Sequence, residues 1–162
     1  MPQITRAFLI LTCVVITAFS QDYRTDMPDA QQQAIEKAIL SVHAEMKKAA
    51  ENLDAEALYD HVLDTGTPPI VEDGRLARTR QDAAQSTKRG LQGLKKLSYS
   101  YDRHHVTVIS PTAALWVAEG SALATIADGR EISAPFAETI VFVQRDGQWK
   151  VLHAHRSAPN QR

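Results

Sequence analysis

Residues 138–157 read Glu-Thr-Ile-Val-Phe-Val-Gln-Arg-Asp-Gly-Gln-Trp-Lys-Val-Leu-His-Ala-His-Arg-Ser. Two runs of strand-forming residues flank Asp146-Gly147, and an Asp-Gly pair in this setting favours a tight hairpin, because a type I′ turn needs positive φ at both central positions. Asp128-Gly129 favours a second tight hairpin in the same way, and Ser110-Pro111 separates the two strands before it. The pattern predicts an antiparallel meander of four strands, at roughly 96–109, 113–127, 131–145 and 148–157.

Apolar residues before this meander follow a helical period. They recur in steps of three and four, the spacing of one buried helix face, at Ile35, Ile39, Val42, Met46, Ala49 and Leu53. Pro28 fits the first turn of this helix, and Asn52 is expected to end it in a left-handed conformation. Asp54 is expected to cap a second, short helix through Leu58 and Tyr59.

A third helix is predicted from Thr79 and Asp82, which resemble a capping box, and Gly90 or Gly93 would end it. Asp73-Gly74 is expected to turn a short strand or loop near residues 68–71. Helices followed by a long antiparallel sheet are typical of the α+β class, in which the helices cover one face of a curved sheet.

The first twenty residues have the pattern of a secretory signal peptide. Arg6 supplies a positive flank, Phe8 to Phe19 form an apolar run, and Ala18-Phe19-Ser20 is a small-x-small cleavage pattern. The run is too short to cross a ~30 Å hydrocarbon layer, so no stable membrane insertion is expected after cleavage. The prediction is a secreted or periplasmic protein with a signal peptide at 1–20, a polar linker at 21–28, one domain at 29–158 and a tail at 159–162.

Composition narrows the function classes. The 162 residues carry 18 Lys and Arg against 19 Asp and Glu, so no basic excess favours nucleic acid as a partner. Cys13, the single cysteine, lies inside the signal sequence, so the mature domain has no thiol for catalysis, a disulfide or a metal. Nucleotide-binding glycine loops and nucleophile elbows are absent from the sequence, and no cofactor is expected.

The Arg-Asp-Gly-x-Trp turn and the His-x-His-Arg-Ser ending of residues 145–157 resemble the end of the calcium/calmodulin-dependent kinase II association domain. That domain belongs to the SnoaL-like, nuclear-transport-factor-2-like superfamily. The resemblance implies a cone-shaped fold, in which about three N-terminal helices pack on a strongly curved sheet and a pocket lies at the open end. Isomerases, dehydratases, cyclases, transport adaptors and oligomerising hubs share this fold, so the fold alone fixes little about function.

The resemblance also implies which side chains face the pocket. Arg156 matches a pocket arginine of the association domains, and Leu152 and Ala154 share its strand face. The two other pocket arginines of that family align with Glu119 and Ile140, so the basic pocket is not retained here. The alternation predicts an inward set that suits a small, partly apolar ligand, namely Leu115, Val117, Glu119, Phe136, Glu138, Ile140 and Phe142.

Two carboxylates in this set, Glu119 and Glu138, are the candidate catalytic residues. A buried carboxylate without a partner has a raised pKa and can act as a general base, as in the isomerases of this fold. The alternative is a Glu–Arg ion pair that only neutralises Arg156. Tyr101, Tyr59 and His61 are further candidates for contacts with a ligand near the open end.

Histidines offer a candidate metal site, at His153 and His155 together with His104 and His105. If Arg156 faces inward, however, alternation turns His153 and His155 outward, unless a β-bulge intervenes, so no metal is predicted.

The segment from Phe136 to Val143 is expected to carry apolar residues on both faces of its strand. Helices can cover only one face, so the other is expected to bury against a second subunit. The prediction is a homodimer through the back of the sheet, with candidate contacts at Trp116, Val141, Val143, Trp149 and Val151.

Three functions therefore remain open from the sequence. The preferred one is an exported domain that binds a small, partly apolar ligand in its cone without chemistry. The second is an isomerase, dehydratase or cyclase with a pocket carboxylate as base. The third is an oligomerising scaffold module.

Overall fold

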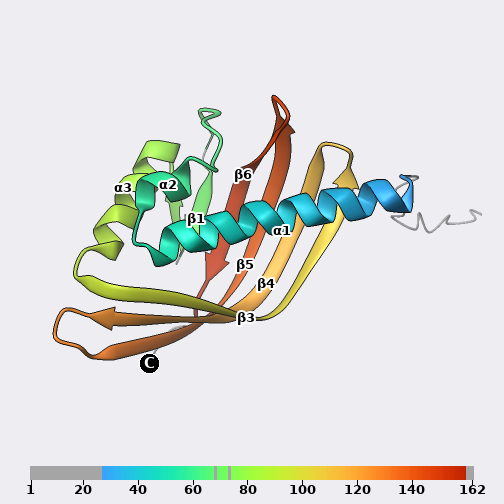
Figure 1. Cartoon of the computed structure of the whole chain (residues 1–162). Coiled ribbons are helices and arrows are strands. Elements are labelled where there is room, and N and C mark those ends of the chain that lie inside the picture. Colours follow the sequence, from blue (N-terminus) through green and yellow to red (C-terminus); the bar gives the residue numbers. More distant parts are fainter. Residues whose placement is uncertain (1–26, 68, 73, 160–162) are drawn as a thin grey trace, which may run out of the picture.

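A computed structural model describes residues 27–67, 69–72 and 74–159 of the chain. The predicted signal peptide, most of the linker and the last residues of the tail therefore lie outside the described residues. The described elements follow the order helix, helix, two short strands, helix and four long strands (Figure 1). They are α1 (Asp29–Glu51), α2 (Ala55–Tyr59), β1 (Ile70–Glu72), β2 (Arg75–Ala77), α3 (Arg80–Leu91), β3 (Leu94–Ser110), β4 (Ala113–Ile126), β5 (Glu131–Arg145) and β6 (Gln148–Ser157).

The helices α2 and α3 begin where capping side chains predict, and α1 begins at Asp29, directly after Pro28. The Asp54 carboxylate accepts a hydrogen bond from the Ala57 backbone N–H, and the Thr79 hydroxyl accepts one from that of Asp82, both at 3.0 Å. The end of α1 differs in detail from the prediction. Leu53, with φ of 60°, takes the left-handed conformation, whereas Asn52 keeps φ at −79°.

The sheet has six strands in the order β2-β1-β6-β5-β4-β3. The four predicted strands form the expected antiparallel meander, and β1 and β2 form a hairpin whose first strand pairs in parallel with β6. Asp146 and Gly147 both have positive φ, 51° and 76°, which confirms the tight turn between β5 and β6.

The turn between β4 and β5 is not the expected two-residue hairpin. Only Gly129 of the Asp128-Gly129 pair has positive φ, and the Asp128 carboxylate accepts hydrogen bonds from Arg130. A two-residue turn would place Glu119 opposite Glu138, whereas the observed turn places Ala118 there. Because a one-residue change in register moves every side chain to the other face, β4 presents Ala114, Trp116, Ala118 and Gly120 to the helices.

The strand β6 contains a β-bulge at Leu152, where the register against β5 changes between Val141 and Phe142. Before the bulge, Trp149 and Val151 face the core. After it, Ala154 and Arg156 do so, opposite Ile140 and Glu138. Without this extra residue, His155 would lie opposite Glu138, so the bulge brings Arg156 to that carboxylate.

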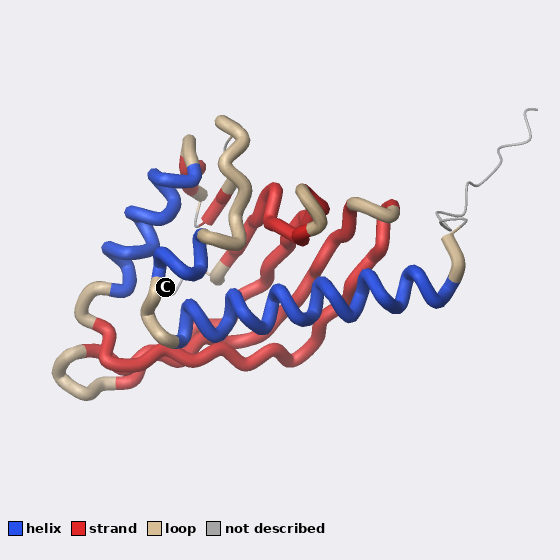
Figure 2. Tube along the Cα trace, turned by 45° about the horizontal axis from the view of Figure 1, so that its top comes forward, coloured by secondary structure: helices blue, strands red, loops and turns tan. Residues whose placement is uncertain are grey.

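The core lies between the helices and the concave face of the sheet. In Figures 1 and 2, α1 runs along this face and crosses several strands, while α2 and α3 lie at one end of it. Ile39 of α1, Phe142 of β5 and Val151 of β6 are fully buried where these layers meet. Trp116, Trp149 and Val151, which were expected to contact a second subunit, belong to this core instead.

The sheet bends sharply where the register of β3 shifts between Tyr101 and Arg103. Gly120 of β4 lies opposite Tyr101, and a Cβ atom on Gly120 would overlap with the Ser100 carbonyl oxygen and lie 3.0 Å from the Cα of Tyr101. The two backbones approach so closely at the bend that only glycine fits. The bend curves the ends of β3 and β4 under the helices and forms the cone.

Candidate functional site

A cavity of about 430 Å³ lies between the helices and the concave face of the sheet. It is within the volume range of small-molecule pockets. About half of the lining residues are apolar, and all three helices and four strands contribute to the lining. The apolar lining residues are Met46, Ala50, Leu58, Val62, Ile70, Leu91, Leu94, Leu97, Ile140, Val151 and Ala154.

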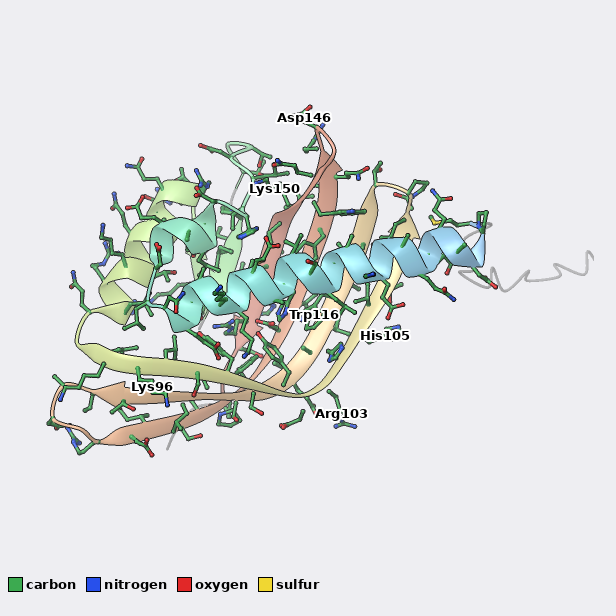
Figure 3. The ribbon with its side chains drawn as sticks, in the orientation of Figure 1. Lys96, Arg103, His105, Trp116, Asp146 and Lys150 are labelled. Atoms are coloured by element: carbon green, nitrogen blue, oxygen red, sulfur yellow. The ribbon has the colours of Figure 1, made fainter. Side chains whose placement is uncertain are left out.

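Glu138 of β5 lies at one side of this cavity, with a side chain that is only 4% exposed. One carboxylate oxygen, Oε1, lies 3.3 Å from His43 Nε2 and 3.3 Å from Trp116 Nε1. The other oxygen, Oε2, accepts a hydrogen bond of 2.8 Å from Arg156 Nη2. Three donors from three elements therefore hold the carboxylate (the Trp116 side chain lies under α1 in Figure 3).

These donors decide the ionisation of Glu138. Burial raises the pKa of its carboxyl group, but the hydrogen bond from His43 and the charge of Arg156 outweigh burial and hold the pKa at about 2. Of the two alternatives for this carboxylate, the structure has the ion pair with Arg156, so the raised pKa of an isolated carboxylate does not apply. An ionised carboxylate can only accept hydrogen bonds, so His43 carries a proton on Nε2.

Arg156 connects this carboxylate to the rest of the cavity. Its Nη1 donates to the Tyr99 hydroxyl at 3.2 Å and lies 3.8 Å from a Glu72 carboxylate oxygen. The guanidinium carbon also lies 5.1 Å from the Tyr99 ring centroid and 5.0 Å from that of Phe136, within cation–π range. The positive charge of Arg156 is therefore stabilised on several sides.

Aromatic rings fix the position of His43. Its ring stacks on Trp116 with centroids 4.0 Å apart and meets the Tyr101 ring edge-on at 4.9 Å. Burial, together with the negative charge of Glu138, raises the pKa of the Tyr101 phenol well above its usual value. Tyr101 therefore stays protonated and can donate a hydrogen bond at neutral pH.

Most of the predicted site residues do come together. Glu138, Arg156, Tyr101, Tyr59 and Ile140 all line the cavity. The Tyr59 hydroxyl bonds to Thr87 of α3 at 2.9 Å, which links α2 to α3 beside the cavity.

Three predicted residues lie elsewhere. Glu119 points to the outer face of the sheet, 48% exposed and paired with Arg103 at 2.6 Å, because the register of β4 differs from the prediction (Arg103 lies outside the bend in Figure 3). Phe142 faces inward as predicted, but is buried in the core away from the cavity. His61 faces α1, with Nε2 4.0 Å from Glu45, and burial lowers its pKa.

The sequence interpretation missed His43 and Trp116, the two residues that hold Glu138 together with Arg156. A signal for His43 exists in the helical period, because it lies four residues after Ile39 and three before Met46, on the buried stripe of α1. A histidine on an apolar stripe needs a hydrogen-bond partner, and here Glu138 supplies it. Nothing comparable identifies Trp116, whose orientation depends on the register of β4.

The other histidines do not form a metal site. Among residues 27–67, 69–72 and 74–159, no three His, Cys, Asp or Glu side chains are grouped to hold a metal ion. The register places His153 opposite Val141 and His155 opposite Thr139, and only His155 of the two is among the residues that line the cavity. Within the same ranges, no helix has the length and apolar character that a membrane span requires.

The chemistry available to the cavity follows from these contacts. Glu138 is ionised and occupied by donors, so it is a poor base. His43, with its proton on Nε2, is left with Nδ1 as its basic atom, and Tyr99 and Tyr101 supply hydroxyl groups. The arrangement can orient a polar group of a ligand beside an apolar surface.

Comparison with known structures identifies the fold. A dehydratase of the NTF2-like family from Streptomyces avermitilis is similar with a TM-score of 0.70 and 18% identity, over 82% of this chain and 99% of that chain. A hexachlorocyclohexane dehydrochlorinase from Novosphingobium barchaimii is similar with a TM-score of 0.69 and 12% identity, over 82% of this chain and 92% of that chain.

A calcium/calmodulin-dependent protein kinase II association domain from Xanthomonas campestris is similar with a TM-score of 0.64 and 14% identity, over 80% of this chain and 89% of that chain. At these identities the likeness concerns the fold alone. No curated protein sequence matches the chain significantly. The SnoaL-like domain family matches residues 39–161, which include α1 from Ile39 onward, the whole sheet and every residue around Glu138. The chain therefore belongs to the SnoaL-like family and has its NTF2-like cone fold.

Proposed function

We propose that this protein binds a small, partly apolar molecule in the cavity of its cone. The observation that carries the proposal is a cavity of about 430 Å³ with aliphatic walls and one pre-assembled polar cluster, formed by Glu138, Arg156 and His43. Ligand sites commonly combine such walls with a few polar groups that fix orientation.

The charges in this cluster favour a ligand whose buried part is uncharged. Glu138 and Arg156 neutralise each other at 2.8 Å, and Lys47 is paired with Glu51 at 3.0 Å. An ion buried beside them would lack a free partner, which is unfavourable in an apolar site. A hydroxyl or carbonyl group, in contrast, could bond to Tyr101 or His43 without disturbing the pair.

A neutral fluorescent probe, N-phenylnaphthylamine, tests this proposal. Wild-type protein is expected to enhance its fluorescence saturably, and Ala154→Phe, which fills the cavity from β6, should weaken binding at least about tenfold. Ser86 is an exposed residue of α3 that also lines the cavity. Ser86→Trp should therefore weaken probe binding to a similar extent without altering the core.

Ala44→Phe is the matched control, because Ala44 lies on the exposed face of α1. If both blocking variants bind the probe as well as wild type and Ala44→Phe do, the probe is not in this cavity and the proposal fails.

A second function, acid–base catalysis, is supported by the His43–Glu138 pair. A histidine oriented by a carboxylate is a common general base, and His43 rather than either glutamate would act as the base here. Similar folds include a dehydratase and a dehydrochlorinase, whose reactions remove a proton and a leaving group. An elimination from a neutral substrate is the corresponding reaction class for this chain.

We also propose that the protein is exported, to the periplasm or outside the cell, and works as a homodimer. The sequence of residues 1–20 supports export. Half-buried aliphatic side chains on the convex face of the sheet support the dimer, because helices cover only the concave face. They are Leu115, Val117, Val141 and Val143.

Val141→Asp should therefore convert a dimer into a monomer, since it would bury a charge at the centre of this surface. Size-exclusion chromatography with light scattering measures the mass, and the dimer dissociation constant should rise at least about tenfold. Ile132→Asp, at an exposed position at the start of β5, should stay dimeric. A wild-type protein that is monomeric at high concentration would contradict the dimer.

A further inference from the structure

Three arginines gather in a second hollow that the proposed function does not use. The hollow measures about 750 Å³ and lies between the β1–β2 hairpin and α3. Arg75 of β2, Arg78 of the following turn and Arg89 of α3 line it, and all three are exposed. We call this hollow the arginine groove.

The arginine groove adjoins the apolar cavity. Tyr59, Ile70, Glu72, Ser86 and Thr87 line both spaces, so one wall made of β1, α2 and α3 is shared. The shared lining places the two spaces side by side, within the length of one elongated molecule. The groove is therefore positioned to contact the outer end of an elongated ligand.

The charges of the groove favour an anion. None of its three arginines forms an ion pair within 4.0 Å with a carboxylate of the described residues, whereas the neighbouring Arg80 is paired with Asp60 at 3.1 Å. Of the two described carboxylates in the lining, Glu72 is near Arg156, at 3.8 Å, and Asp82 lies in the first turn of α3. A guanidinium group can bind a carboxylate through two parallel hydrogen bonds.

We propose that the arginine groove binds the anionic head group of an elongated amphiphile, such as a medium-chain carboxylate, whose apolar part occupies the cavity. This inference rests on the proposed function, because the apolar part needs the cavity. It adds a ligand class, since a neutral molecule of the same length would gain nothing from the groove.

Competition against N-phenylnaphthylamine with decanoate and with decanol, at pH 8, tests the inference. The two competitors share a chain length and differ in the charge of the head. Decanoate is expected to bind wild-type protein roughly five- to tenfold more tightly than decanol. This is the gain in affinity expected from two or three exposed contacts between the carboxylate and the arginines. Raising the salt concentration should reduce this preference, because exposed ion pairs are screened.

The triple variant Arg75→Gln, Arg78→Gln, Arg89→Gln should remove the preference and leave decanol binding unchanged. The corresponding Lys triple should retain part of it. Arg103→Gln, Arg130→Gln, Arg145→Gln is the matched control, because it changes the net charge equally at exposed arginines outside the groove.

Equal affinity for decanoate and decanol in wild-type protein would overturn the inference while leaving the cavity proposal intact. A preference that persists in the groove triple, or that the control triple also removes, would overturn it too. If neither competitor displaces the probe, or the probe does not bind, the cavity proposal and this inference both fail.

Discussion

Gly120→Ala is expected to lower the free energy of unfolding by at least about 3 kcal/mol, as severe overpacking does. The added Cβ would overlap with the Ser100 carbonyl oxygen, and neither backbone can move without breaking the β3–β4 pairing at the bend. Denaturant unfolding followed by circular dichroism measures the change.

Gly90→Ala provides the matched control. Gly90 lies in α3, and a Cβ there would have no atom within 4 Å. Alanine favours a helix over glycine, so this variant should be unchanged or more stable by up to about 1 kcal/mol. Equal stability of the Gly120→Ala variant and wild type would show that the strands are not in close contact at the bend.

Glu138→Gln is expected to lower the free energy of unfolding by on the order of 3 kcal/mol at pH 6, because it removes the nearer, buried counter-charge of the Arg156 guanidinium. The effect should depend on pH. The pKa of Glu138 is about 2 in the folded protein, below the usual carboxyl value of 4.5. The ionised carboxylate therefore stabilises the fold above about pH 4.5, and this contribution is lost as the pH falls toward 2.

Chemical unfolding of wild type and Glu138→Gln at pH 6 and pH 2.5 measures this dependence. The difference between the two proteins should shrink to less than about 1 kcal/mol at the lower pH. Glu119→Gln is the control, since its exposed pair with Arg103 should contribute less than about 1 kcal/mol at either pH. A difference between wild type and Glu138→Gln that is independent of pH would contradict the ionised, triply bonded carboxylate.

The elements of this fold could be predicted from local signals in the sequence. Asp54 and Thr79 begin helices as their side chains predict, and Asp146-Gly147 turns the last hairpin. Each of these signals depends on a few neighbouring residues, so it can be interpreted without knowing the rest of the chain.

The direction of side chains on the strands could not be predicted equally well. The predicted alternation of side chains on β5 was right, and Glu138 does face the cavity. The alternation on β4 was wrong, because the turn at Asp128-Gly129 is not a two-residue hairpin and Ala118 rather than Glu119 lies opposite Glu138. On β6 the predicted alternation was wrong for Trp149 and Val151, because the bulge at Leu152 turns both side chains to the core.

His43 shows why a site is harder to predict than a fold. Its helix was predicted, but its partner Glu138 is 95 residues away in the chain. The contact depends on how α1 crosses the sheet, which no local pattern encodes. The same holds for Trp116, which reaches Glu138 from β4, whereas the pair between Arg156 and a pocket carboxylate is one of the two alternatives that the sequence offers.

Binding and catalysis make different demands on His43. In a protein that only binds, His43→Gln should change ligand affinity modestly, because an amide can also donate to Glu138. In an enzyme, the same variant should retain the ligand and lose its conversion, because an amide cannot accept a proton at neutral pH. Identification of the natural ligand is therefore the step on which both functions depend.

The most direct measurement is native mass spectrometry of the protein purified from its own host, under conditions gentle enough to retain a ligand. The proposal predicts a reproducible small-molecule adduct on the wild-type protein that is absent from the Ser86→Trp variant purified in the same way. A wild-type protein that carries no adduct and does not bind N-phenylnaphthylamine would contradict a ligand-binding cone.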